Sequence, residues 1–82
     1  MKPGPPRVRT LDVRPLLAAG GSPFEKILAA SQELAEGESL LLITPFLPSP
    51  IIEKLQSEGF QARTERRADG GWQTHFTAGG VK

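Results

Sequence analysis

The chain has 82 residues, 10 basic and 9 acidic side chains and no cysteine. A chain of this length forms one domain that buries only about 60% of the surface of its unfolded form, so it has no room for a second lobe and a deep cleft. The net charge of +1 gives no overall field that would attract nucleic acid or membrane lipid, and the lack of cysteine excludes disulfides, thiolate metal sites and persulfide chemistry.

The two ends of the chain are expected to lie outside the folded domain, which we place at residues 7–78. Residues 1–6 contain three prolines and read as a disordered lead, and residues 79–82 read as a flexible tail. The N-terminus shows no export signal, and the longest apolar run, Leu40 to Ile43, is far below the ~20 residues of a membrane span. We therefore expect a cytoplasmic protein that does not enter a membrane.

The first predicted element is a strand within RVRTLDV, residues 7–13. Its apolar residues Val8, Leu11 and Val13 do not all fall on one side of a strand, which predicts a short or bulged strand. After a loop, a helix is predicted whose apolar face has the spacing i, i+3, i+4, i+7 and i+10. That face consists of Phe24, Ile27, Leu28, Ser31 and Leu34. Gly37 is the expected end of this helix.

The next two elements are a buried strand and a second helix. The run ESLLLIT is continuously apolar from Leu40 to Ile43, as in a strand that is covered on both sides or lies in the middle of a sheet. The second helix is predicted to begin at Ser49, with Pro50 in its first turn, and to end at Gly59.

Two strands complete the predicted domain. From Phe60 to Arg67 apolar or small residues alternate with charged ones, and ADGGW provides an Asp-Gly turn into WQTHFT. The predicted order is β-α-β-α-β-β, an α/β two-layer sandwich with two helices on one face of a four-stranded mixed sheet. The opposite face of the sheet is expected to be polar.

This order and several short motifs resemble the TusA/SirA-like sulfur-carrier superfamily. The motifs are LDVR at the end of the first strand, SP at the first helix, GESLLLI in the second strand and DGGW in the hairpin. The resemblance covers roughly residues 9–78 and points to an uncharacterised bacterial branch. It implies the TusA-like sandwich, but in the carriers a cysteine in Cys-Pro-x-Pro holds the persulfide. Here Ser22 takes that place, and its hydroxyl lacks the acidity and softness for sulfur transfer.

Two candidate sites lie near the start of the first helix. Ser22 and Glu25 have the S-x-x-E spacing of a capping box, which we favour over a nucleophile because no base is placed near Ser22. Gly20, Gly21 and Ser22 could form an anion-binding loop, although a flexible connector is the simpler interpretation. No catalytic, cofactor or metal site is predicted, since one histidine cannot assemble a metal site.

The remaining candidates are for interaction. His75 is expected on the polar sheet face, and Arg63, Arg66 and Arg67 form the one plausible basic patch, read as a solvated face or as an RNA site. Phe46 and Leu47, between Pro45 and Pro48, either cover the sheet edge, which we favour, or dock a partner. In relatives of the uncharacterised branch a histidine often occupies the position of Phe46.

From these residues we expect a non-enzymatic module that acts by protein interaction or regulation. RNA or polyanion binding through Arg63, Arg66 and Arg67, and small-anion capture at residues 20–22, are the alternatives. No cofactor is expected. A protein partner is expected, with nucleic acid as a weaker possibility, and the sequence leaves the oligomeric state open.

Overall fold

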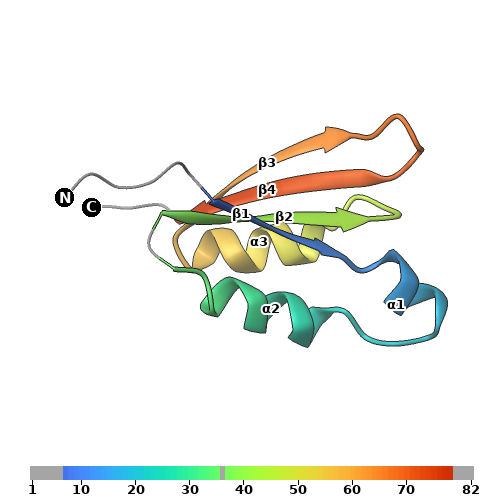
Figure 1. The fold of residues 1–82 in the computed structure, drawn as a ribbon, viewed down its shortest axis with the longest axis horizontal. Helices are drawn as coiled ribbons and strands as arrows, with labels where there is room; N and C mark the ends of the chain where they lie inside the picture. Colours follow the sequence, from blue (N-terminus) through green and yellow to red (C-terminus); the bar gives the residue numbers. More distant parts are fainter. Residues whose placement is uncertain (1–6, 36, 79–82) are drawn as a thin grey trace.

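A computed structural model describes residues 7–35 and 37–78 of the chain. The elements follow the order β-α-α-β-α-β-β (Figure 1). Their bounds are β1 Arg7–Asp12, α1 Arg14–Ala18, α2 Phe24–Gln32, β2 Glu38–Thr44, α3 Ser49–Ser57, β3 Phe60–Arg66 and β4 Trp72–Ala78. The predicted lead, residues 1–6, and tail, residues 79–82, lie outside the described residues.

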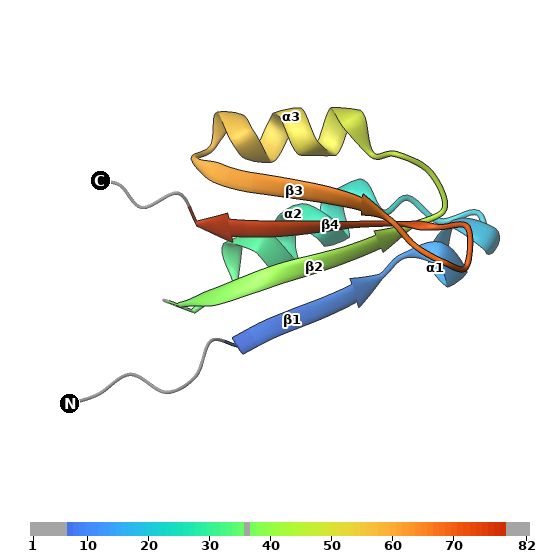
Figure 2. The same cartoon turned by 90° about the horizontal axis from the view of Figure 1, so that it is seen from above.

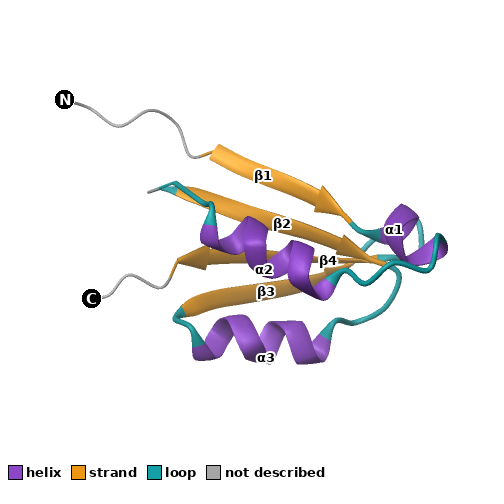
Figure 3. Cartoon of the chain, turned by 90° about the horizontal axis from the view of Figure 1, so that it is seen from below, coloured by secondary structure: helices purple, strands orange, loops and turns teal. Residues whose placement is uncertain are grey.

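The strands form one mixed sheet in the order β1-β2-β4-β3, in which β1 and β2 are parallel and the other pairs are antiparallel. Figure 3 shows α2 lying across β2 and β4 and α3 lying along β3, both on the same side of the sheet. Seen from the other side, the strands lie in front of α2, and none of the described helices covers them (Figure 2). The predicted α/β class and four-stranded mixed sheet are confirmed.

The helix α1 was not predicted, because only a loop was expected between the first strand and the helix that contains Phe24. This helix has five residues and no fully buried side chain, with Pro15 in its first turn. Pro fits there because a first-turn residue has no N–H partner within the helix. The helix ends where the amides of Gly20 and Gly21 donate to the carbonyls of Leu17 and Leu16 at 3.0 and 2.9 Å. The predicted order β-α-β-α-β-β is therefore short by one helix.

The first strand is short, and its pairing with β2 runs without interruption from Arg7↔Glu38 to Asp12↔Ile43. The suggested bulge is wrong. Val13 breaks the alternation because it lies beyond the end of the strand, at the start of α1, where its amide donates to the Ile43 carbonyl at 3.1 Å. Val13 is buried there.

The core lies between the helices and the covered face of the sheet. Its buried apolar side chains are Val13, Ile27, Leu40, Leu42, Ile51, Leu55 and Phe76. Ile27 and Ser31 of the predicted helix face are buried, and Leu28 packs against the core. Leu34 also packs there but lies beyond α2, which ends at Gln32, so the helix end predicted at Gly37 is wrong. Phe24, however, is 40% exposed, because helical side chains lean toward the N-terminus and Phe24 is the first residue of α2.

The later elements match their predicted positions. The helix α3 begins at Ser49 and is followed by Gly59, whose amide donates to the Gln56 carbonyl at 3.1 Å. The hairpin between β3 and β4 is closed by a hydrogen bond from the Arg67 amide to the Gly71 carbonyl, with Gly70 at φ +90°. A three-residue loop that ends in a residue of positive φ is a common hairpin connection. In the described part of the chain, no helix is long and apolar enough to span a membrane.

Candidate functional site

The loop between β2 and α3 presents two large apolar side chains. Phe46 and Leu47 are 49% and 46% exposed. The loop is held from both sides, because the hydroxyl of Thr44 donates to the Phe46 carbonyl and the Ser49 amide donates to the Leu47 carbonyl, the latter at 3.0 Å. Pro48 is buried. About half of each of the two side chains is therefore exposed on a loop whose backbone is held on both sides.

This loop lies in the longest uncharged part of the folded domain. No charged residue occurs between Glu38 and Glu53, a stretch that includes all of Pro45–Pro50. The exposed Phe24 is the first residue of α2, and α2 begins at the same end of the domain as the end of β2, where this loop starts (Figure 1). A partner at this loop would meet apolar and neutral polar groups, so its binding would depend on apolar contact.

The uncovered face of the sheet carries polar side chains on its two C-terminal strands. The pairing of β3 with β4 sets Arg63 opposite His75 and Gln61 opposite Thr77. On the neighbouring strand β2, the Ser39 hydroxyl lies 2.8 Å from Nε2 of His75. His75 is thus on the uncovered face, as the alternation of residues predicted. Its contact with Ser39 depends on the order of the strands and was not predicted.

The three arginines of the predicted basic patch do not share a surface. Arg63 is on the uncovered face, whereas Arg66 pairs in register with Trp72 and lies over its ring at 5.7 Å. Side chains of opposite parity in a strand point to opposite faces. Arg67 lies beyond the strand and binds Asp69 at 3.2 Å and the Gln73 side chain at 2.9 Å. The Gln73 side chain is on the uncovered face, as Arg63 is, so Arg66 alone is separated from the expected patch of Arg63, Arg66 and Arg67.

A chain of ion pairs joins the end of β1 to the hairpin. Arg14 binds Asp12 through Nε and Nη2, at 3.0 and 2.9 Å, and reaches Asp69 through Nη1 at 3.0 Å. The hydrogen bond from Arg14 lowers the pKa of Asp12. The Gly71 amide and then Arg14 hold the pKa of Asp69 well below its usual range, and the two carboxylates raise the pKa of Arg14.

These ion pairs connect two of the motifs on which the resemblance rested. Asp12 and Arg14 belong to LDVR, and Asp69 and Gly71 belong to DGGW. A Cβ on Gly71 would lie 3.0 Å from the Thr44 carbonyl oxygen and 3.2 Å from Nη1 of Arg14, so a glycine fits where the hairpin meets β2. Both motifs thus have a structural role at the carboxyl end of β1 and β2.

The start of α2 differs from both sequence interpretations of residues 20–25. The first helical hydrogen bond runs from the Ile27 amide to the Pro23 carbonyl at 2.9 Å, which makes Pro23 the N-cap. The capping box of Ser22 and Glu25 is therefore wrong: Ser22 precedes the cap position, and no side-chain cap bond occurs at α2 within the described ranges.

The predicted anion loop lacks free donors in its glycines. The amides of Gly20 and Gly21 already donate to carbonyls of α1, so the two glycines of residues 20–22 have no amide left for an anion. Within residues 7–35 and 37–78, no three His, Cys, Asp or Glu side chains gather into a group that could hold a metal ion.

The comparisons with known proteins place the chain in one family. Residues 10–78 match the model of an uncharacterised conserved protein family, DUF2249. No curated protein and no solved structure matches the sequence significantly. The matched residues run from the second half of β1 to the end of β4 and include the apolar loop, the ion pairs and the uncovered sheet face. Since the match covers most of the chain, the protein belongs to the DUF2249 family.

Proposed function

We propose that this domain is a non-enzymatic module that binds a protein partner through the loop of residues 45–48. The observation that carries the proposal is the exposure of Phe46 and Leu47 on a backbone held by Thr44 and Ser49. A loop whose backbone is already held by hydrogen bonds loses less entropy when a partner docks. The expected partner surface is apolar, since the loop itself carries no charge.

We further propose that the domain is related to the TusA/SirA-like carriers and serves in regulation rather than in sulfur transfer. The mixed four-stranded sheet with α2 and α3 on one side supports the relationship. Ser22 stands where the carriers have their cysteine, and a serine hydroxyl does not hold a sulfane sulfur. The extra helix α1 lies in the connection between β1 and α2.

A pull-down at high salt tests the docking proposal. The bait is the tagged full chain, and the variant is Phe46→Ser combined with Leu47→Ser. Val8→Ser is the matched control, because Val8 is 50% exposed but pairs with Ser39 at the opposite end of β2. We expect a protein that wild type and Val8→Ser retain and the double variant loses.

Equal retention by all three baits contradicts the proposal, because the loop would then have no part in binding. Retention of nucleic acid alone, and only at low salt, also contradicts it, since electrostatic binding to phosphates weakens steeply with salt. Thermal unfolding of the three baits checks that each is folded. Two exposed substitutions are expected to change stability by about 0.5 kcal/mol or less each.

A further inference from the structure

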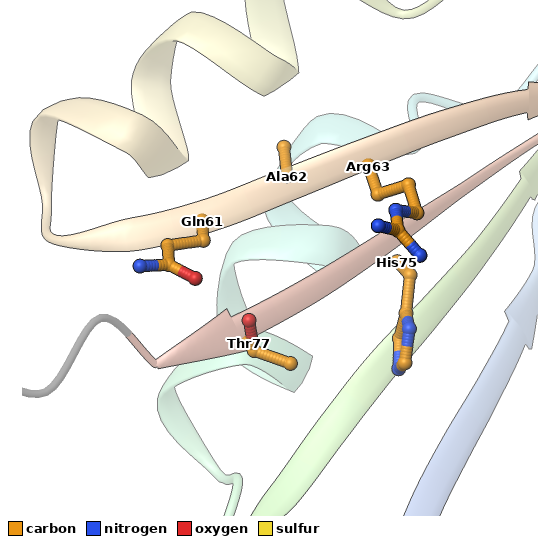
Figure 4. A pocket seen from close by; sticks show the side chains of 5 residues that line it. All are labelled: Gln61, Ala62, Arg63, His75 and Thr77. Carbon is orange, nitrogen blue, oxygen red and sulfur yellow. The ribbon is translucent and has the colours of Figure 1, made fainter.

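The uncovered face of the sheet contains a shallow hollow of about 360 Å³, apart from the apolar loop. Its lining residues are Gln61, Ala62, Arg63, His75 and Thr77. Figure 4 shows the polar side chains of β3 and β4 on the side of the hollow, whereas Ala62 points to the other side of the sheet. The volume is at the lower end of the range of small-molecule sites, about 300–1,000 Å³.

The strand register builds this hollow from two cross-strand pairs. Arg63 faces His75, and Gln61 faces Thr77. Directly opposite side chains on antiparallel strands lie about 5 Å apart at Cβ, so all four border one small area. The guanidinium, the amide, the hydroxyl and the imidazole can all donate hydrogen bonds to an oxygen of a ligand.

The charges around the hollow favour an anion. None of the five lining residues is acidic, and Arg63 makes no ion pair or side-chain hydrogen bond among the residues that the structure describes. Glu65, two residues along β3 on this face, accepts a hydrogen bond from the Gln73 side chain at 3.3 Å. His75 is oriented by Ser39 at 2.8 Å. An unpaired guanidinium beside an oriented imidazole suits a planar or tetrahedral oxyanion.

We propose that the hollow binds a small molecule that carries one phosphate group, such as a phosphate monoester. Arg63 binds the phosphate through two N–H groups, and His75 and Thr77 donate to its remaining oxygens. A polynucleotide fits less well, because Arg66 is on the other face and Arg67, toward the hairpin, already binds Asp69 and the Gln73 side chain. This site is separate from the apolar loop, and the proposal does not depend on the docking of a protein there.

Amide chemical shifts of the full chain, recorded during titration with inorganic phosphate and with 5′-AMP, test the proposal. We expect shifts at residues 61–63 and 75–77, and a Kd at least tenfold weaker in Arg63→Gln. Arg66→Gln is the matched control, since Arg66 is in the same strand on the other face, and its Kd should stay within twofold of wild type. His75→Gln should weaken binding severalfold, while thermal unfolding confirms that each variant is folded.

Several results would overturn the proposal. Absence of shifts with both phosphate probes is one, and equal affinities of wild type and Arg63→Gln are another. A third is tighter binding of a 12-residue oligouridylate, with a slope steeper than about −2 in a plot of log binding constant against log salt concentration. Each phosphate contact contributes about −0.7 to that slope, so such a slope indicates several contacts rather than one. That result would assign the face to RNA.

Discussion

Removal of the Thr44 hydroxyl is expected to loosen the loop that presents Phe46 and Leu47. The side chain of Thr44 is 1% exposed, and its hydroxyl donates to the Phe46 carbonyl. Thr44→Val keeps the shape of the side chain and removes this donor. The net value of such a hydrogen bond is about 0.5–1.5 kcal/mol. The lower half of that range applies if water reaches the half-exposed Phe46 and satisfies its carbonyl.

The expected loss of about 1 kcal/mol corresponds to a Tm lower by roughly 4–8 °C in a domain of this size. Differential scanning calorimetry measures that shift, and amide hydrogen exchange measures the opening of the loop at Phe46, Leu47 and Ser49. Thr44→Ser is the control, because it loses a methyl group and keeps the hydroxyl. Its exchange in the loop should match wild type even where its Tm falls. Faster loop exchange in Thr44→Ser than in Thr44→Val would refute the role of the hydrogen bond.

Further substitutions test the core, the hairpin and the ion pairs. Leu55→Ala truncates a fully buried side chain and should lower the free energy of unfolding, measured by chemical denaturation, by about 2–5 kcal/mol. Leu47→Ala is the exposed control and should lower it by about 0.5 kcal/mol or less. Similar losses of stability in the two variants would contradict the assigned core. Gly71→Ala places a Cβ 3.0 Å from the Thr44 carbonyl oxygen and should lower stability by about 1–3 kcal/mol, and an unchanged denaturation midpoint would show that the hairpin is free to shift. The folded-state pKa of Asp12 and Asp69 is lowered, so their stabilisation is present above the unfolded pKa, near 4, and is lost as the pH falls through the folded values. Thermal unfolding from pH 6 to pH 2 should therefore give Asp69→Asn a lower Tm than wild type at pH 6 and a smaller fall in Tm toward pH 2. Plots of Tm against pH that run parallel for the two proteins would exclude Asp69 as a source of acid sensitivity.

Elements marked by local signals could be predicted from the sequence, and those that depend on neighbouring segments could not. The continuous apolar run of β2, Gly59 after α3 and the Asp-Gly turn are all local, and the structure has each of them in place. The helix α1 was missed because five residues are too few to show helical periodicity, although Pro15 and Gly20 are typical start and end signals. Ser22 has the sequence of a cap but not the position, because α2 begins one residue later than predicted.

The candidate surfaces show the same limit. That Arg63 and Arg66 lie on opposite faces follows from the two-residue period of a strand and was open to prediction. The pairing of Ser39 with His75 requires that β4 lie beside β2 in a given register, which no local signal defines. The exposure of Phe46 and Leu47 depends on the path of the loop relative to the sheet, and this path rests on the buried hydroxyl of Thr44.

The affinity of the domain for its retained partner tests the docking proposal most directly. Titration calorimetry with that purified partner should give a Kd roughly 10- to 100-fold weaker for Phe46→Ser with Leu47→Ser, if each half-exposed side chain contributes about 1 kcal/mol or more on burial. Val8→Ser should leave the Kd unchanged, and a rise in salt from 0.1 to 0.5 M should change it little, with a negative heat-capacity change on binding. Equal affinities of wild type and double variant, or binding abolished by salt, would contradict an apolar docking surface at residues 45–48.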